Sequence, residues 1–402
     1  MIIKTDTENK LFVPLMAFLM SLIALAIDAM LPALNQIKES LNIENANDVQ
    51  LVISSVFFGM SFGLLLFGPL SDAYGRKKPL YFGILIFIIG SFVSLLSKDL
   101  DIMLFGRFLQ GFGASSCRVI STAMIRDKFS GQEMGKVMSL IMMIFIIVPA
   151  LAPSLGQLIL FYSTWHSIFL TFIILAFIAL LILWIRQEET LKLDKRIPIS
   201  FKEIIRGSKE TLTTTATRGY ILSSGLIFGA FVGYLSSSQQ ILQNLYNAGD
   251  KFSLLFGCLA ICIGISSFIN SRLVDSYGMR ELSIFSLIAL CILSSVFLIY
   301  LFLSGGSTGL LQTMIYLGTS FLFIGILFGN LNTLAIEPLG HIAGMANSVI
   351  SAVQTIISVG IGGYIGRLYN GTLYPLAGGF LILGILSIIC IVLHSQKTLE
   401  KV

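Results

Sequence analysis

Charged residues are scarce in this chain: Asp, Glu, Lys and Arg make up 12% of its 402 residues, whereas apolar residues make up 55%. This balance leaves too little polar surface to coat a soluble globular protein. The chain has five cysteines, all inside apolar runs, and three histidines, so neither a disulfide framework nor a metal site is indicated. It also lacks a glycine-rich phosphate-binding loop with Lys and Ser or Thr. We therefore expect no enzyme activity and no cofactor.

Long apolar runs take the place of charge. A helix needs about 20 apolar residues to cross a hydrocarbon core of about 30 Å, and within lipid a helix satisfies all of its own backbone hydrogen bonds. We therefore predict an all-α polytopic membrane protein with twelve transmembrane helices. They are expected at 11–34, 48–71, 79–97, 101–125, 134–158, 166–186, 219–241, 252–273, 281–303, 310–333, 344–366 and 373–393.

One long polar segment divides these helices into two groups of six. We predict an N-terminal six-helix bundle over 1–186, a cytoplasmic linker over 187–218 that contains a short amphipathic helix, and a C-terminal six-helix bundle over 219–402. The loops on one side carry twenty Lys and Arg residues and those on the other side carry four. Because cytoplasmic loops are enriched in these residues, both termini are expected in the cytoplasm. The linker interleaves basic with acidic residues, so no nucleic-acid partner is indicated.

A six-residue pattern recurs in the two halves, as LSDAYG at 70–75 and LVDSYG at 273–278. Each copy follows an apolar run and precedes basic residues, which indicates a cytoplasmic turn between two helices. The first copy, within GPLSDAYGRK, matches the loop signature Gly-x-Leu-x-Asp-x-x-Gly-Arg-Lys, and the twelve-helix chain resembles the major facilitator superfamily. The resemblance implies two bundles that alternate access across the membrane, with an Asp–Arg latch that pairs across the bundle interface. The corresponding gate-loop residues are Gly68, Asp72, Gly75, Arg76, Asp275 and Gly278.

Three further stretches resemble the drug and proton antiporter branch, in particular the bicyclomycin-resistance family. They are AIDAMLPALNQI in the first helix, LFGRFLQGFGASSCRV in the fourth and VPALAPSLGQLI in the fifth. The resemblance implies export of a small molecule in exchange for protons. The fifth helix contains Pro149, Pro153 and Gly156, which interrupt backbone hydrogen bonds and leave a small surface, so we expect it to bend and slide.

Three charged residues lie inside the expected helices, away from the loops and helix ends: Asp28, Arg107 and Arg118. A charge within the membrane is costly, so these side chains should face the bundle interior. Asp28 and Arg107 each lie roughly 9 Å from the outer ends of their helices, and we predict that they form the proton-coupling site. The alternative is a fixed ion pair that stabilises the bundle. Arg118 lies on the same stripe as Arg107, and it either meets an anionic substrate or extends to the inner membrane surface.

Uncharged polar residues gather in otherwise apolar helices, and the first, fourth, seventh and tenth helices line the central cavity in the superfamily. An open alternative is that these residues bond one helix to another. The expected substrate-cavity residues are Gln110, Arg118, Tyr234, Gln239, Gln240, Asn330 and Asn332.

Together these features predict a proton-coupled secondary transporter that exports small amphipathic molecules or drugs. Its expected partners are a small-molecule substrate, protons and the lipid bilayer, and it is expected to be a monomer in the bacterial inner membrane. One alternative is an exporter of an endogenous metabolite such as a siderophore, an amino acid or a sugar. A more distant alternative is a non-transporting membrane sensor built on the same fold.

Overall fold

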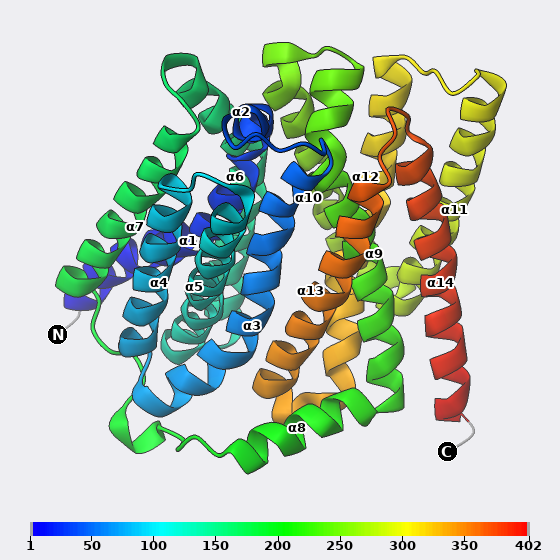
Figure 1. Ribbon diagram of the computed structural model, residues 1–402. Helices are drawn as coiled ribbons and strands as arrows, with labels where there is room; N and C mark the ends of the chain where they lie inside the picture. The colour runs from blue at the N-terminus through cyan, green and yellow to red at the C-terminus, as the bar shows by residue number, and fades with distance from the viewer. Residues whose placement is uncertain (1–2, 400–402) are drawn as a thin grey trace. The chain divides into compact units, whose positions relative to one another are not determined.

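Long α-helices make up most of the chain in a computed structural model, which describes residues 3–399 (Figure 1). Twelve of these helices coincide with the expected transmembrane helices, so the predicted all-α membrane fold is confirmed. They are α1 Ile3–Asp28, α3 Leu51–Tyr74, α4 Lys77–Leu95, α5 Leu100–Lys128, α6 Gly131–Tyr162, α7 His166–Arg186, α9 Thr215–Gln239, α10 Phe252–Tyr277, α11 Met279–Leu303, α12 Leu310–Ile336, α13 Ala343–Arg367 and α14 Tyr374–Leu399.

Two shorter α-helices complete the set. α2 spans Leu34–Ser40, and α8 spans Phe201–Thr213 within the predicted linker. The short helix expected in that linker is therefore confirmed, and its position on the membrane surface stays a prediction. Residues Gln240–Leu245 extend α9 as a π-helix. The part of the chain that the structure describes contains helices, turns and irregular segments but no β-strand.

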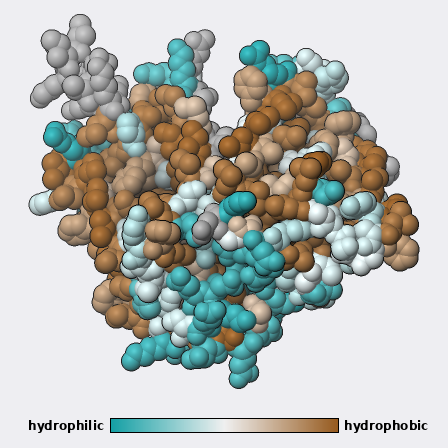
Figure 2. Space-filling view, turned by 90° about the horizontal axis from the view of Figure 1, so that it is seen from above, coloured by the Kyte–Doolittle hydropathy of each residue, from teal (hydrophilic) through white to brown (hydrophobic). Residues whose placement is uncertain are grey.

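Apolar side chains cover much of the outer surface. Large residues such as Phe161, Trp184 and Phe302 are at least 70% exposed, and Figure 2 shows apolar residues over much of the visible face, with polar residues gathered in patches. Within residues 3–399, nine stretches are long and apolar enough to cross a membrane, and one of them, Leu310–Arg367, contains both α12 and α13. This is the surface expected of a protein whose solvent is lipid.

The helices form two compact units. Unit 1 comprises residues 1–44 and 55–200, and unit 2 comprises residues 45–54 and 201–402. The division between α7 and α9 therefore falls at Ser200 and Phe201, inside the predicted linker 187–218. A short segment before and at the start of α3 belongs to unit 2, whereas the rest of α3 belongs to unit 1.

Glycines bring α3, α4 and α5 of unit 1 close together. A Cβ atom on Gly111 of α5 would lie 1.9 Å from the backbone oxygen of Val56 on α3. A Cβ atom on Gly90 of α4 would lie 2.4 Å from the backbone nitrogen of Gln110 on α5. Helices in a membrane associate through close packing at small residues, so these glycines fix how near α5 lies to its neighbours.

In unit 2, α9 packs against α13 through a regular row of glycines. Gly225, Gly229 and Gly233 lie four residues apart on one face of α9, as expected for a helical ridge. Each glycine contacts an isoleucine of α13, in the order Ile357, Ile361 and Ile365. Another face of α9 carries aromatic side chains, and the Phe231 ring lies 5.5 Å from Phe328 and 5.6 Å from Phe321 of α12. α9 is therefore the central helix of its unit.

We predict that Gly111→Ala destabilises the protein by about 1–3 kcal/mol, because the added methyl group would overlap the α3 backbone. Thermal unfolding of the purified protein measures this loss. Gly360→Ala on α13 is the matched control, since a Cβ atom there meets open space. Equal melting temperatures for the two variants would contradict the packing argument.

Candidate proton and gating sites

The first membrane helix breaks next to Asp28. α1 ends at Asp28, a 3-10 turn follows over Leu31–Ala33, and α2 begins at Leu34. Pro32 lies in this turn, and a proline both lacks an N–H donor and disfavours helical geometry in the preceding residue. A helix end leaves its last carbonyl groups without partners in the helix. The carbonyl groups near Asp28 therefore need other donors.

Arg107 of α5 provides one of these donors. Its Nη2 donates to the Ala26 carbonyl oxygen over 2.8 Å, and its Nη1 donates to Oε1 of Gln110. Nε2 of Gln110 donates in turn to Oγ of Ser91 on α4 over 2.8 Å. Arg107 and Gln110 have no exposed surface. A cation at a helix C-terminus is also favoured by the helix dipole. Together, these hydrogen bonds form one buried network that joins α1, α4 and α5.

Asp28 lies in the same turn of α1 as Ala26, but it is not bonded directly to Arg107. Asp28 is 6% exposed, and its carboxylate has no ion-pair or hydrogen-bond partner among the side chains that the structure describes. Arg107 contacts the Ala26 carbonyl group, two residues before Asp28. The alternative of a fixed Asp28–Arg107 ion pair therefore has no contact behind it in this structure.

Gly156 of α6 packs directly on this break in α1. A Cβ atom on Gly156 would lie 2.0 Å from the Ala29 carbonyl oxygen and 3.1 Å from Cγ of Pro32. α6 remains one continuous helix although Pro149 and Pro153 lie inside it. The glycine thus allows close contact with α1, while the bending of α6 stays a prediction.

Arg76 is the centre of the first gate loop. Its Nη1 donates to Asp72 and to Oγ of Ser71, and its Nε donates to Asp127 over 2.9 Å. Burial alone would lower the pKa of the Arg76 guanidinium, but the hydrogen bonds and charges of Asp127 and Asp72 outweigh burial and raise it. Both carboxylates belong to unit 1, whereas the family resemblance implies a pairing across the bundle interface.

The beginning of the predicted linker folds onto this loop. The Glu189 carboxylate accepts hydrogen bonds from the backbone N–H groups of Arg76, at 2.8 Å, and Lys77, at 3.1 Å. These groups lie at the N-terminus of α4, where a negative charge is favoured. Ile197 N–H donates to the Asp72 carbonyl group over 3.1 Å. The segment from Glu189 to Ile197 is therefore part of unit 1 and not a freely solvated connection.

The second copy of the pattern keeps the turn but not the ion pairs. Gly75 has φ +89° and Gly278 has φ +82°, values in the left-handed region that favours glycine. Met279 occupies the position that corresponds to Arg76. Asp275 is exposed, and it forms no ion pair with any basic residue whose side chain the structure describes. Gly68, the remaining gate-loop residue, accepts a hydrogen bond from Ser71 Oγ through its carbonyl oxygen.

The predicted cavity residues of the second half are largely bonded to other residues of unit 2. The amides of Asn330 on α12 and Asn270 on α10 exchange two hydrogen bonds, of 2.8 Å and 2.9 Å. Gln239 donates to Gln243 over 2.9 Å. Gln240 accepts a hydrogen bond from Gln50, which lies in the segment 45–54 of the same unit. The alternative of helix-to-helix bonding therefore describes Asn330 well.

The remaining cavity candidates differ in environment. Tyr234 is buried, and its ring lies 4.8 Å from that of Phe321. Asn332 and Arg118 are half-buried. Gln110 belongs to the Arg107 network described above. Gln110 and Arg118 belong to unit 1 and the other five residues belong to unit 2. A cavity that all seven residues share stays a prediction.

Several residues that bond to the predicted site residues were not identified from the sequence. Asp127, Glu189 and Asn270 all contact predicted site residues. Asp127 and Glu189 lie at the end of α5 and after α7, in polar stretches where one carboxylate resembles the next. Asn270 lies near the end of α10, and an asparagine inside an otherwise apolar run was the one signal that could have found it.

Comparison with known proteins agrees with this architecture. The model of the Major Facilitator Superfamily matches residues 16–363. The chain belongs to this superfamily. It is therefore a multi-pass membrane transporter, and none of the compared proteins named below is an enzyme.

Individual relatives narrow the resemblance. An uncharacterized transporter of the same superfamily, YdgK of Bacillus subtilis (strain 168), is 34% identical over 350 residues, which cover 85% of this chain and 86% of the relative. A bicyclomycin resistance protein homolog of Haemophilus influenzae is 28% identical over 378 residues, or 91% of each chain. A crystal structure of a D-xylose-proton symporter aligns with a TM-score of 0.72 at 17% identity and covers 96% of this chain and 97% of the other. The last likeness supports the fold alone.

We predict that Asp127→Ala destabilises the protein by about 2 kcal/mol or more, because Asp127 accepts charge-assisted hydrogen bonds from Nε and Nη2 of Arg76. Asp72→Ala removes a single ion pair to the same guanidinium and should cost about half as much. Thermal unfolding of the two variants makes the comparison. A larger loss from Asp72→Ala would mean that Asp127 is not the principal partner of Arg76.

Proposed function

We propose that the protein exports small molecules in exchange for protons, and that Asp28 carries the proton. The observation behind this proposal is a carboxyl group buried at a break in a membrane helix, with no hydrogen-bond partner among the residues whose side chains are described. Burying an unpaired carboxylate is costly, so the uncharged acid suits this environment. An ionisable residue inside a membrane span is a functional-site candidate for the same reason.

Coupling between substrate movement and proton movement then depends on whether water reaches Asp28. Water that reaches the α1 break solvates the carboxylate and favours loss of the proton, and closure of the site favours its return. Arg107 is held by the carbonyl group of Ala26, two residues before Asp28, so it supplies a positive potential without neutralising Asp28 permanently. A proton can therefore be exchanged at Asp28 while the helices stay joined.

Alternating access supplies the vectorial step. We assign the two six-helix groups, residues 1–186 and 219–402, as bundles that move about a central site, with both termini in the cytoplasm and one chain as the working unit. The loop around Arg76 contains the charge cluster suited to a gate, because ion pairs at a surface can break and reform. The names of relatives, bicyclomycin resistance protein homolog and multidrug resistance protein MdtL, favour drug-like cargo.

The test is gradient-driven uptake of bicyclomycin and a panel of amphipathic compounds into everted membrane vesicles. We expect Asp28→Asn to reduce uptake driven by a proton gradient at least tenfold, because the amide cannot release a proton. Exchange of substrate down its own gradient should persist.

Asp101→Asn is the matched control, since Asp101 is an exposed carboxylate in the first turn of α5. Gradient-driven uptake that is the same in the wild type and in Asp28→Asn would remove Asp28 from the coupling step. A panel that yields no flux in the wild type under any gradient would favour a sensor over a transporter.

A further inference from the structure

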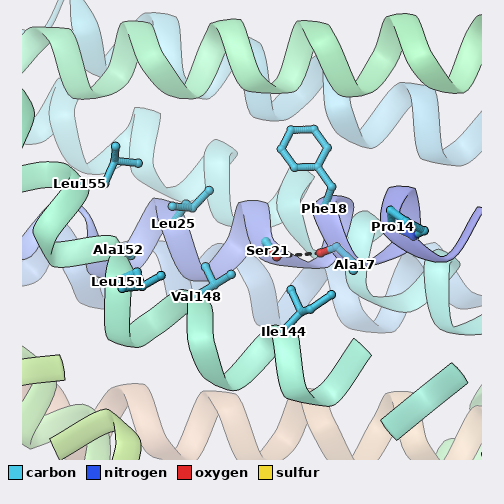
Figure 3. Close-up of a pocket in the computed structure, with 10 residues that line it drawn as sticks. All are labelled: Pro14, Ala17, Phe18, Ser21, Leu25, Ile144, Val148, Leu151, Ala152 and Leu155. Atoms are coloured by element: carbon cyan, nitrogen blue, oxygen red, sulfur yellow. Dashed lines mark hydrogen bonds between the residues drawn. The ribbon is translucent and has the colours of Figure 1, made fainter. Parts of the chain in front are cut away.

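Unit 1 contains an apolar groove between α1 and α6. It runs along α1 from Pro14 to Leu25 and along α6 from Ile144 to Leu155, with a volume of about 360 Å³. Figure 3 shows Val148 and Ile144 of α6 opposite the turn of α1 that carries Ser21. Eleven residues of helix rise about 16 Å, so the groove is long enough for an extended chain.

The lining offers almost no hydrogen-bonding capacity. Among the lining residues, Ser21 is the one with a side-chain hydroxyl group. That group donates to the Ala17 carbonyl oxygen over 2.7 Å (Figure 3). The other lining side chains are aliphatic or aromatic. A site of this size and character matches the apolar body of a small ligand.

Two contacts between α1 and α5 locate the groove along the helices. At one end, Arg107 donates to the Ala26 carbonyl group. At the other, Nζ of Lys128 lies 4.4 Å from the ring centre of Phe12. Arg118 lies between these contacts on α5, and the groove residues of α1 lie between them on α1. Arg118 and the groove therefore occupy the same level of unit 1.

Arg118 brings a positive charge to this level. It is half-buried, and it forms no ion pair with the carboxylates whose side chains the structure describes, a set that excludes Asp6, Glu8 and Asp250. Helical side chains lean toward the helix N-terminus. The Arg118 side chain therefore points toward the N-terminal end of α5 and away from its basic C-terminal end at Arg126 and Lys128. This direction disfavours an arginine that extends to the membrane surface at that end. The guanidinium instead remains available to an anion from outside the protein.

We propose that the transported substrates are anionic amphiphiles, with the apolar body in the α1/α6 groove and the anionic group paired with Arg118. This assignment rests on the proposed export function and specifies its substrate class. An anion at Arg118 compensates a charge that the described fold leaves without a carboxylate. The groove supplies the apolar burial that a charged head group alone would lack.

Equilibrium binding to the protein in lipid nanodiscs tests the proposal without any proton gradient. The probe is tritiated octanesulfonate, with octyltrimethylammonium and ethanesulfonate as competitors. The first competitor keeps the apolar chain and reverses the charge, and the second keeps the charge and loses the chain. We expect octanesulfonate to bind and each competitor to displace it at least tenfold more weakly than unlabelled octanesulfonate.

Two variants with matched controls locate the probe. Arg118→Gln should raise the Kd for octanesulfonate about tenfold, the scale of a lost charge-assisted pair, whereas Arg126→Gln should leave it within twofold. Val148→Phe fills the groove and should raise the Kd several-fold. Ile147→Phe places the same aromatic side chain at the adjacent residue, which is 46% exposed and outside the groove, and should leave the Kd unchanged. Melting temperatures verify that all four variants are folded.

Several results would overturn the proposal. They are equal competition by the cationic probe, an Arg118→Gln variant with wild-type affinity, or a Val148→Phe variant with wild-type affinity. Native mass spectrometry that finds a phospholipid retained by the wild type and lost from Val148→Phe would assign the groove to bilayer lipid instead. Octanesulfonate binding by Asp28→Asn separates the two proposals, because substrate recognition can survive when gradient-driven uptake is lost. Gradient-driven uptake of other compounds by a wild type that does not bind octanesulfonate would retain the export function and overturn the substrate class.

Discussion

The hydrogen bonds of the Arg107 guanidinium group are the interaction on which the α1 break in unit 1 depends. A proline break inside a membrane helix exposes carbonyl groups that neither lipid nor the helix can satisfy. Arg107 satisfies the Ala26 carbonyl group, and it is fixed in turn by Gln110. Because the break is supported from α5, the backbone at Asp28 can be irregular without being unstable. A fixed positive charge near a buried carboxyl group follows from the same arrangement.

The two copies of the loop pattern separate geometry from chemistry. Gly75 and Gly278 have nearly the same positive φ, so the internal repeat preserves a turn. The charge cluster exists in the first copy, where Arg76 gathers Asp72 and Asp127 and Glu189 caps α4. A turn depends on one residue's backbone, whereas the cluster depends on residues from three separate segments. Repetition of a short sequence therefore carries over the turn more readily than the ion pairs.

The positions of the helices could be predicted from the sequence, and so could the burial of Asp28 and Arg107. Both predictions depend on local properties, namely the length of an apolar run and the cost of exposing a charge to lipid. Partner choice was not predictable in the same way. Asn330 meets Asn270 across 60 residues, and Gln240 meets Gln50 across 190 residues. Such pairs depend on the rotation and register of helices, which a single apolar pattern leaves open. Gly156 was recognised as a small contact surface, but its contact with the α1 break required the structure.

The two units divide the work of the membrane interior in different ways. Unit 1 holds Asp28, Arg107 and Arg118 within its spans, whereas the contacts of unit 2 described above are amide pairs and aromatic rings. Amides and rings have no proton to exchange near neutral pH, so they can shape a wall but cannot couple it to a gradient. Because Asp28 and the two arginines inside the expected spans belong to unit 1, a change at Asp28 acts first on the α1 break and its neighbours α5 and α6. Under the two proposals above, proton binding at Asp28 acts on the helices that line the apolar groove, so coupling and recognition would share α1 and α6.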